Sequence, residues 1–185
     1  MMKPRPSKPT KTEILAAVGK TVPDLIAPGL KVLFCGINPS LYSAVVGHHF
    51  ARPGNRFWPA IHAAGFTDRL LSPFEADEFL ALGYGITNLV ERATAGANDL
   101  ALAELLAGPQ QLERKIHQYR PACVALLGIE TYRRAFGRRQ ATLGRQPETL
   151  GSSTLWVLPN PSGLNAHYQL ADLARLYGEL RLAVT

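Results

Sequence analysis

Two asparagines stand directly after apolar segments of the chain, and each begins the same Asn-Pro-Ser turn. Asn38 follows the run 31–36, and Asn160 follows the run 155–158. Apolar runs of this kind are typical of buried strands, and open α/β sheets bind their ligands at the carboxyl ends of such strands. An asparagine amide can hold a ligand or a water by hydrogen bonds, but it does not titrate. The spacing therefore predicts a ligand-binding rim at which the two turns face each other.

Two more apolar segments, residues 84–90 and 122–128, are predicted as strands. The second is apolar throughout, which is typical of a parallel strand that is covered on both faces. With residues 31–36 and 154–158 they make about four strands, and helical patterns separate them. Strands that alternate with helices indicate an α/β fold of three layers, α/β/α, around a mostly parallel central sheet.

The helices are predicted from capping residues and from apolar side chains that recur at helical spacing. They span residues 13–18, 55–64, 73–82, 110–119, 130–136 and 169–183, and a short one is expected between Asp99 and Gly108. Residues 41–53, rich in Gly, His and aromatic side chains, are predicted as a loop. A loop of this length inside a compact domain is usually functional.

The composition is typical of one globular domain: 46% of the 185 residues are hydrophobic and 18% are charged. No apolar run approaches the roughly 20 residues of a membrane span. No apolar segment follows the first charges, as it would in a secretory signal. We therefore expect a cytoplasmic protein with no membrane partner. The two cysteines stand in apolar runs, which indicates core packing, and they are too few to ligate an iron–sulfur cluster.

The chain is basic, with a formal net charge of +6 and a pI near 9.6. This favours an anionic partner such as nucleic acid, although a merely basic protein would have the same charge. Residues 1–12 contain four basic residues, three prolines and no acidic residue. We expect a flexible basic arm over residues 1–20, followed by a single domain over residues 21–185.

Three motifs, in this order along the chain, carry a resemblance to a known family. They are Gly-Ile-Asn-Pro at residues 36–39, Phe-Ala-Arg-Pro-Gly-Asn-Arg-Phe-Trp at 50–58 and Leu-Pro-Asn-Pro-Ser-Gly-Leu at 158–164. Together they resemble the mismatch-specific uracil/thymine-DNA glycosylases, one branch of the uracil-DNA glycosylase superfamily. The likeness runs from about Leu25 to the C-terminus, and it implies a uracil-DNA glycosylase-like fold.

The resemblance implies a monofunctional DNA glycosylase of base excision repair. Such an enzyme flips uracil out of a G·U mismatch in double-stranded DNA and hydrolyses its N-glycosidic bond, which leaves an abasic site. It uses no cofactor and no metal ion, and the motifs contain no lysine nucleophile for a lyase step. Other damaged pyrimidines are further candidate substrates, and we expect the protein to be a monomer.

In this family the counterpart of Asn38 positions the water that attacks C1′ of the flipped nucleotide, so Asn38 is the first catalytic candidate. An amide cannot take the proton of that water, and a general base is typically worth ~10²–10⁴ in rate, so the enzyme is expected to be slow. The alternative role of Asn38 is to close the turn before proline. Phe50 corresponds to the aromatic residue that stacks on the extruded base. Ile37, Ser40 and Ser43 are expected to line the same pocket.

The second Asn-Pro-Ser turn is expected to hold the DNA. Gly163 and Leu164 resemble the wedge that enters the duplex and fills the space of the flipped nucleotide, while the backbone of the turn contacts the opposing guanine. Asn160 and Ser162 are predicted to bind the phosphate beside the lesion, and Asn165 belongs to the same DNA-binding turn. Turn capping is the alternative role of Asn160 and Ser162.

Three residues depart from the pattern of the family. Ser40 stands where the family often has glycine. Ala166 stands where bacterial relatives commonly have an arginine, so that selectivity for the opposite base is expected to be relaxed. Asn88 replaces a lysine that is common at the rim of the second strand, which removes one cation from the cleft.

A carboxylate could supply the general base that Asn38 lacks. Asp99 ends the rim loop after the second strand and is the second catalytic candidate. Glu91 is closer to the strand, but Arg92 beside it is its expected ion partner. The alternative role of Asp99 is to cap the helix that follows it.

Two other functions are compatible with a fold of this kind. One is a non-catalytic DNA-binding module for mismatches or abasic sites, in which Asn38 is structural. The other is a nucleotide-binding hydrolase of similar three-layer build, but the sequence lacks the glycine-rich phosphate loop that would support it.

Overall fold

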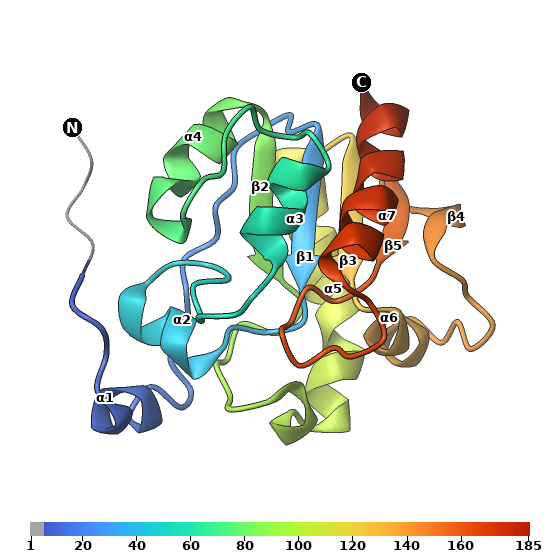
Figure 1. The fold of residues 1–185 in the computed structure, drawn as a ribbon. Coiled ribbons are helices and arrows are strands. Elements are labelled where there is room, and N and C mark those ends of the chain that lie inside the picture. The colour runs from blue at the N-terminus through green and yellow to red at the C-terminus, as the bar shows by residue number, and fades with distance from the viewer. Residues whose placement is uncertain (1–5) are drawn as a thin grey trace.

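The computed structural model describes residues 6–185, and its centre is a five-stranded β-sheet between two layers of helices (Figure 1). The strands are β1 (Val32–Gly36), β2 (Tyr84–Asn88), β3 (Cys123–Leu127), β4 (Gly144–Leu150) and β5 (Ser153–Leu158). Their order in the sheet is β2-β1-β3-β5-β4, and all are parallel except β4, which pairs antiparallel with β5. The predicted α/β/α fold with a mostly parallel sheet is confirmed.

Strand β4 adds one strand to the predicted sheet. It is polar apart from Leu150, and it contains Pro147. It lies at the edge of the sheet, and its register against β5 shifts between Arg145 and Thr149. A sheet edge tolerates proline and irregular pairing, because one side of the strand needs no partner for its backbone groups. The strand therefore has no continuous apolar pattern that the sequence could reveal.

The helices of the described chain are α1 (Lys11–Leu15), α2 (Leu41–Val46), α3 (Phe57–Ala63), α4 (Ala76–Ala81), α5 (Leu102–Tyr119), α6 (Ile129–Ala135) and α7 (Leu170–Val184). Short 3-10 turns, Pro73–Glu75 and Ala97–Asp99, precede α4 and α5. Side chains of α3, α4 and α7 pack on one face of the sheet, and those of α5 and α6 pack on the other. In β1, Val32 and Phe34 join the first core while Leu33 and Cys35 join the second, as the alternation of a strand requires.

Two predicted elements differ from the structure. The predicted loop 41–53 begins with α2, and the predicted break before Pro109 does not occur, because α5 runs through it. An interior proline costs a helix about 3 kcal/mol. Leu105 and Leu112 are buried on either side of it, which offsets this cost and keeps the two halves in one helix.

The N-terminal segment is folded from α1 onward. A capping box starts this helix, in which the carboxylate of Glu13 accepts a hydrogen bond from the backbone N–H of Thr10 at 2.7 Å. Ala17, shortly after the helix, is completely buried. Residues 11–20 of the predicted flexible arm therefore contact the domain through Ala17 and through the backbone of Gly19 and Lys20, while most of their side chains are exposed. Residues 1–5 of that arm lie outside the described residues.

The thiols of Cys35 and Cys123 are buried and unpaired, so their predicted place in the core is confirmed. Within residues 6–185, no helix has the length and apolar character that crossing a membrane requires.

All four parallel strands end at the same edge of the sheet, which is the lower edge in Figure 1. The segments that follow β1, β2 and β5 meet at this edge. Any side chain at the end of these strands is therefore brought close to the others.

Candidate active site

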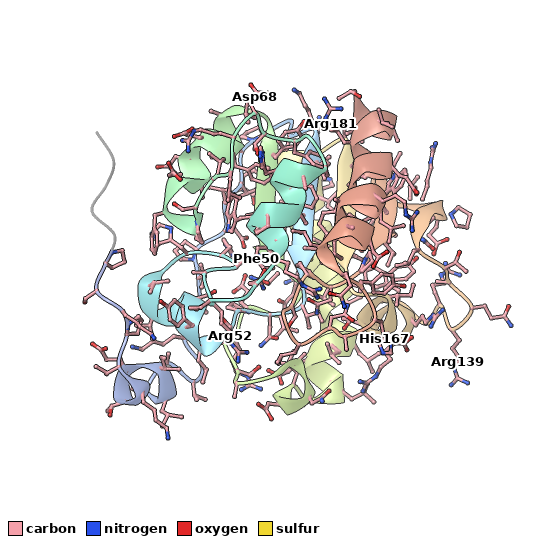
Figure 2. All side chains as sticks on the ribbon, viewed as in Figure 1. Phe50, Arg52, Asp68, Arg139, His167 and Arg181 are labelled. Atoms are coloured by element: carbon pink, nitrogen blue, oxygen red, sulfur yellow. The ribbon has the colours of Figure 1, made fainter. Side chains whose placement is uncertain are left out.

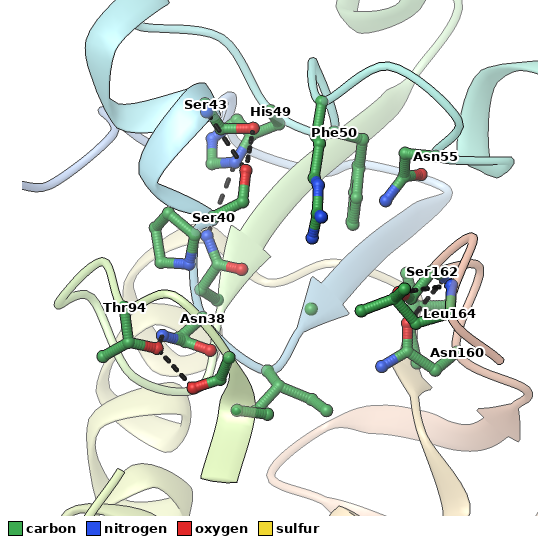
Figure 3. A pocket seen from close by; sticks show the side chains of 18 of the residues that line it. Asn38, Ser40, Ser43, His49, Phe50, Asn55, Thr94, Asn160, Ser162 and Leu164 are labelled. Atoms are coloured by element: carbon green, nitrogen blue, oxygen red, sulfur yellow. Dashed lines mark hydrogen bonds between the residues drawn. The ribbon is translucent and has the colours of Figure 1, made fainter. Parts of the chain in front are cut away.

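A pocket of about 150 Å³ opens at the carboxyl ends of β1 and β2 (Figure 3). The predicted site residues that line it are Ile37, Asn38, Ser40, Ser43, Phe50, Asn160, Ser162 and Leu164. Gly163, Asn165 and Asp99 do not line it. Both Asn-Pro-Ser turns thus contribute to one pocket, and Figure 3 shows them on opposite sides of it.

The side-chain amide of Asn38 is held in one orientation. Its Nδ2 donates to the carbonyl oxygen of Arg92 at 2.9 Å and to Oγ1 of Thr94 at 2.7 Å. A backbone carbonyl only accepts, and the hydroxyl of Thr94 donates its own proton to the carbonyl of Gly96 at 2.7 Å. The NH₂ group must therefore be on this side of the amide. Both of its protons are used, and Oδ1 remains as an acceptor on the pocket side (Figure 3).

Phe50 forms a rigid wall of the pocket. Its φ is +53°, a backbone conformation that a non-glycine residue adopts only where the surroundings hold it. The ring stacks on Phe57 in the core, with 4.2 Å between the ring centroids. Its edge lies over Gly36, where an added Cβ would be 3.3 Å from Cζ of Phe50. The ring is therefore backed by the core on one side and borders the pocket on the other.

His49 and Asn88 form a hydrogen-bonded pair at the inner end of the pocket. Asn88 ends β2, and its Nδ2 lies 3.4 Å from Nδ1 of His49. The other ring nitrogen, Nε2, lies 2.8 Å from the carbonyl oxygen of Pro23. Since that carbonyl only accepts, Nε2 carries the ring proton and Nδ1 accepts from Asn88. Burial lowers the pKa of His49, which favours this neutral form.

The orientation of the Asn88 amide follows from this pair. With Nδ2 turned towards His49, Oδ1 lies beside Gly36. A Cβ at position 36 would lie only 2.7 Å from Oδ1, so glycine is needed there to keep the acceptor at the pocket.

Two serines tie the start of α2 to the segment that carries Phe50. Oγ of Ser40 accepts from the N–H of Ser43 at 3.1 Å and thereby caps α2. The hydroxyl of Ser40 donates to Oγ of Ser43, which also accepts from the N–H of Ala51. The Ser43 hydroxyl proton remains for a ligand in the pocket.

Leu164 projects from the second Asn-Pro-Ser turn and is 76% exposed. The turn that carries it is held from within. Oδ1 of Asn160 accepts from the N–H of Ser162 at 2.9 Å, and Oγ of Ser162 accepts from the N–H of Leu164 at 3.2 Å. Asn165 donates from Nδ2 to the carbonyl of Asn160, so its side chain braces the loop. These bonds leave the Asn160 Nδ2 donor at the pocket.

Arg52 is the charged side chain at this site. It is exposed at the mouth of the pocket, and in Figure 2 it lies below Phe50, at about the height of His167. Arg139 extends from the right-hand edge in that view, far from Phe50.

All residues that line the pocket lie within a stretch of the chain that matches a known family. A model of the uracil DNA glycosylase superfamily matches residues 23–181, which is most of the chain and includes every residue of the pocket. The chain belongs to the uracil DNA glycosylase superfamily. Members of this superfamily are DNA glycosylases, which hydrolyse N-glycosyl bonds in DNA and act in base excision repair.

In this superfamily member, Asp99 is not at the pocket. It is exposed in the 3-10 turn Ala97–Asp99, and its carboxylate accepts from the N–H of Gly96 at 3.1 Å. It does not cap α5 either, because that helix begins two residues after Leu100 and the carboxylate of Glu104 accepts from the N–H of Ala101 at 2.8 Å. The geometry therefore gives no support to Asp99 as a general base.

The other acidic candidate is also occupied elsewhere. Glu91 pairs with Lys115 at 3.1 Å, while Arg92, its expected partner, pairs with Glu104 at 2.8 Å. No carboxylate is present among the described residues that line the pocket. The described lining of the pocket thus offers an amide acceptor but no carboxylate.

Arg56 joins the two segments that line opposite sides of the pocket, the one with Phe50 and the one with Leu164. Its backbone N–H donates to the carbonyl of Pro161 at 2.9 Å. Its guanidinium donates to three more backbone carbonyls of the same loop, those of Ser162, Asn165 and Tyr168. Gly163 packs on Gly54, where an added Cβ would lie 2.6 Å from the carbonyl oxygen of Gly54. These contacts fix the loop of Leu164 relative to the segment of Phe50.

Sequence reasoning missed the supporting roles of Arg56, His49, Asn88 and Thr94. For Asn88 a signal was present, because it stands at the end of a predicted strand, much as Asn38 directly follows one. Arg56 lies inside the motif 50–58, but nothing nearby in the sequence indicates that its acceptors are backbone carbonyls more than a hundred residues away. For Thr94 no sequence signal exists.

Proposed function

We propose that the protein is a monofunctional uracil-DNA glycosylase of the mismatch-specific branch. It flips uracil out of a G·U mismatch in double-stranded DNA and hydrolyses the N-glycosidic bond, leaving an abasic site. The observation that carries this proposal is the fixed amide of Asn38, whose acceptor oxygen lies at a pocket with no carboxylate among its described lining residues.

The chemistry that this amide supports is hydrolysis by an oriented water. Cleavage of the bond builds positive charge on the sugar and negative charge on the leaving uracil. Oδ1 of Asn38 accepts a hydrogen bond from the water and directs its oxygen at C1′, but it does not take the proton. The water oxygen bonds to C1′, the glycosidic electrons leave with uracil, and the proton goes to solvent or to the departing base. Without a general base the enzyme is expected to be slow.

Recognition of uracil is supported by the groups around the pocket. The ring of Phe50 offers a flat face for stacking, and the backbone after Ile37 and the Ser43 hydroxyl offer donors for the oxygens of the base. Oδ1 of Asn88 is an acceptor and suits the N3–H of uracil. Cytosine has an acceptor at N3, so the same oxygen would repel it. The pocket therefore favours uracil over the normal base cytosine.

The DNA is held by the loop of Leu164. An exposed leucine on a braced turn can enter the base stack and fill the space of the flipped nucleotide. Nδ2 of Asn160 and the guanidinium of Arg52 are donors at the mouth for phosphate oxygens. The backbone of Gly163 and its neighbours is available to contact the opposing guanine. Since Ala166 replaces an arginine of the family pattern, we expect uracil opposite adenine to be processed as well.

The proposal is tested with a labelled G·U duplex in the presence of a chelator, followed by alkali to cleave abasic sites. We expect strand cleavage by the native protein. Asn38→Ala should lower the single-turnover rate by roughly 100-fold or more, because the water is no longer positioned, while DNA affinity changes little. The matched control is Asn98→Ala, which removes an exposed amide outside the pocket.

Two outcomes would contradict the proposal. Binding of the mismatch without cleavage by the native protein would identify a non-catalytic DNA-binding module, the alternative function. Cleavage that persists at the native rate in Asn38→Ala would show that another group positions the water.

A further inference from the structure

The segment before the superfamily match packs beside the active site. Figure 1 shows α1 next to α2, at the same edge of the sheet as the pocket. The match begins at residue 23, so residues 10–20 lie before the matched region. We refer to residues 10–20 as the N-terminal strap.

The strap binds Ala93, in the loop after β2, through both the N–H and the C=O of the Ala93 backbone. The N–H of Gly19 donates to the carbonyl of Ala93 at 3.0 Å, and the N–H of Ala93 donates to the carbonyl of Lys20 at 2.8 Å. Ala17 and Ala93 are each completely buried and pack with Leu41 of α2 in a small apolar cluster. The contact therefore combines two backbone hydrogen bonds with a buried apolar cluster.

The residues on either side of Ala93 are the two that hold Asn38. Nδ2 of Asn38 donates to the carbonyl of Arg92 and to the hydroxyl of Thr94. A displacement of Ala93 would move both acceptors at once. The strap is bonded to the backbone of Ala93, and the two residues next to Ala93 in the chain hold the amide of Asn38.

We propose that the N-terminal strap is a positioning element for catalysis, which fixes the orientation of the Asn38 amide by clamping residues 92–94. This inference rests on the proposed hydrolytic function and adds to it a segment that touches neither base nor water. A rival role follows from charge: Lys8, Lys11 and Lys20 are exposed, and an arm of this kind could instead add contacts to DNA phosphates.

The test uses full-length protein with Gly19→Pro. Proline removes the N–H that reaches Ala93 and cannot adopt the φ of +80° at this position. The matched control is Gly29→Pro, because Gly29 also has a positive φ, of +70°, and donates its N–H to a backbone carbonyl, that of Tyr119, at 2.8 Å. Gly29 does not line the pocket, and its backbone hydrogen bond to Tyr119 involves neither the strap nor residues 92–94.

We expect Gly19→Pro to lower the single-turnover rate at saturating G·U duplex on the order of 10- to 100-fold, with the dissociation constant for DNA unchanged within about twofold. Gly29→Pro should keep the native rate. Ala17→Asp, which places a charge in the buried apolar cluster, should act like Gly19→Pro.

A second measurement does not depend on activity. Both side-chain protons of Asn38 are hydrogen-bonded, so its ¹⁵N-labelled amide should give two resolved NMR signals that exchange slowly with water. In Gly19→Pro these protons should exchange faster, and in Gly29→Pro they should not. This readout keeps its meaning even if the native protein cleaves no uracil, in which case the proposed function fails and the positioning of the amide stands.

Three results would overturn the strap proposal. One is an unchanged rate in Gly19→Pro with weaker DNA binding and a smaller salt dependence, which identifies a DNA-contacting arm. Another is an equal loss of rate in Gly29→Pro, which identifies general destabilisation. The third is unchanged exchange of the Asn38 amide protons in both strap variants.

Discussion

The imidazole of His49 accepts a hydrogen bond from the side-chain amide of Asn88, with 3.4 Å between Nδ1 and Nδ2. The two residues are 39 positions apart in the chain and meet at the inner end of the pocket. Because Nε2 carries the ring proton and donates it in a hydrogen bond to the carbonyl of Pro23, Nδ1 of the neutral ring can act only as an acceptor towards Asn88. The direction of this bond determines which atom of Asn88 a bound base meets.

The neutral state of His49 predicts a loss of stability in mild acid. Burial lowers the pKa of His49, against opposing effects of the Pro23 carbonyl and Asp24, while His48 and Lys115 lower it further. An unfolded histidine titrates near 6.5, so below this pH the unfolded chain binds a proton that the folded chain resists. The contribution of neutral His49 to the free energy of unfolding is therefore complete above about pH 6.5. It declines as the pH falls from there towards the pKa of His49 in the folded protein.

Urea denaturation from pH 8 to pH 5 measures this effect in the native protein and in His49→Gln. Glutamine offers an acceptor and a donor but does not titrate, so the variant should lose less free energy of unfolding than the native protein over this range. His117→Gln is the control, since His117 is exposed. Equal pH dependence in the native protein and His49→Gln would contradict the assignment.

We predict that Oδ1 of Asn88 selects bases that carry an N3–H. Asn88→Ala removes the acceptor and should lower kcat/KM on a G·U duplex by about 10- to 100-fold, the loss of one buried hydrogen bond of about 1–3 kcal/mol. The same assay with 3-methyluracil, which has no N3–H, tests the contact directly. The native protein should strongly prefer uracil over 3-methyluracil, and Asn88→Ala should lose most of that preference. A preference that survives in the variant would place the N3 contact elsewhere.

Because Arg56 holds the loop of Leu164, we predict that replacing Arg56 impairs the insertion of Leu164 into DNA. A lysine keeps the charge, but a single ammonium cannot reach the three carbonyls that the guanidinium spans. With 2-aminopurine next to the uracil, insertion of Leu164 should appear as a rise in fluorescence when the neighbouring base unstacks. Arg56→Lys should reduce this rise towards that of Leu164→Ala and lower kcat/KM about tenfold, the loss of about 1–2 kcal/mol of hydrogen bonding.

The control for this variant is Arg175→Lys, which changes an exposed arginine in a surface ion pair with Glu179. It should behave as the native protein does. A full fluorescence rise in Arg56→Lys would mean that the loop of Leu164 holds its place without the guanidinium.

Gly36 predicts a loss of base binding when even one carbon is added. In Gly36→Ala the new Cβ would lie 2.7 Å from Oδ1 of Asn88 and 3.3 Å from Cζ of Phe50, so one of these groups must move. We expect kcat/KM to fall by roughly 100-fold while the circular dichroism spectrum stays native. Gly178→Ala in α7 is the matched control, because its nearest contact would be at 3.9 Å. Native activity in Gly36→Ala would show that the pocket has room to adjust.

The four parallel strands were predictable because each contains a run of apolar residues, unbroken in β3, and burial of a strand on both faces favours that pattern. Strand β4 was not, since Gln146, Pro147 and Glu148 form no such run and the strand exists through its pairing with β5. The continuity of α5 through Pro109 likewise depends on burial on the sheet, which outweighs a local rule about proline. The sequence likewise does not reveal that Asp99 belongs to the 3-10 turn Ala97–Asp99, in which its carboxylate accepts from the N–H of Gly96 and does not line the pocket.

The α/β architecture, the positions of Asn38 and Asn160 after strands, and the motifs of the superfamily are all readable in the local pattern of residues. The directions of the Asn38 and Asn88 amides, the contacts that hold Leu164 and the contact of the N-terminal segment with Ala93 emerge only when the chain is folded. The difference lies in the groups that each feature depends on. Burial imposes a periodic pattern on local sequence, whereas the groups that orient these side chains are mostly backbone N–H and C=O groups, which nearly every residue has and which become specific only when the fold brings them within hydrogen-bonding distance.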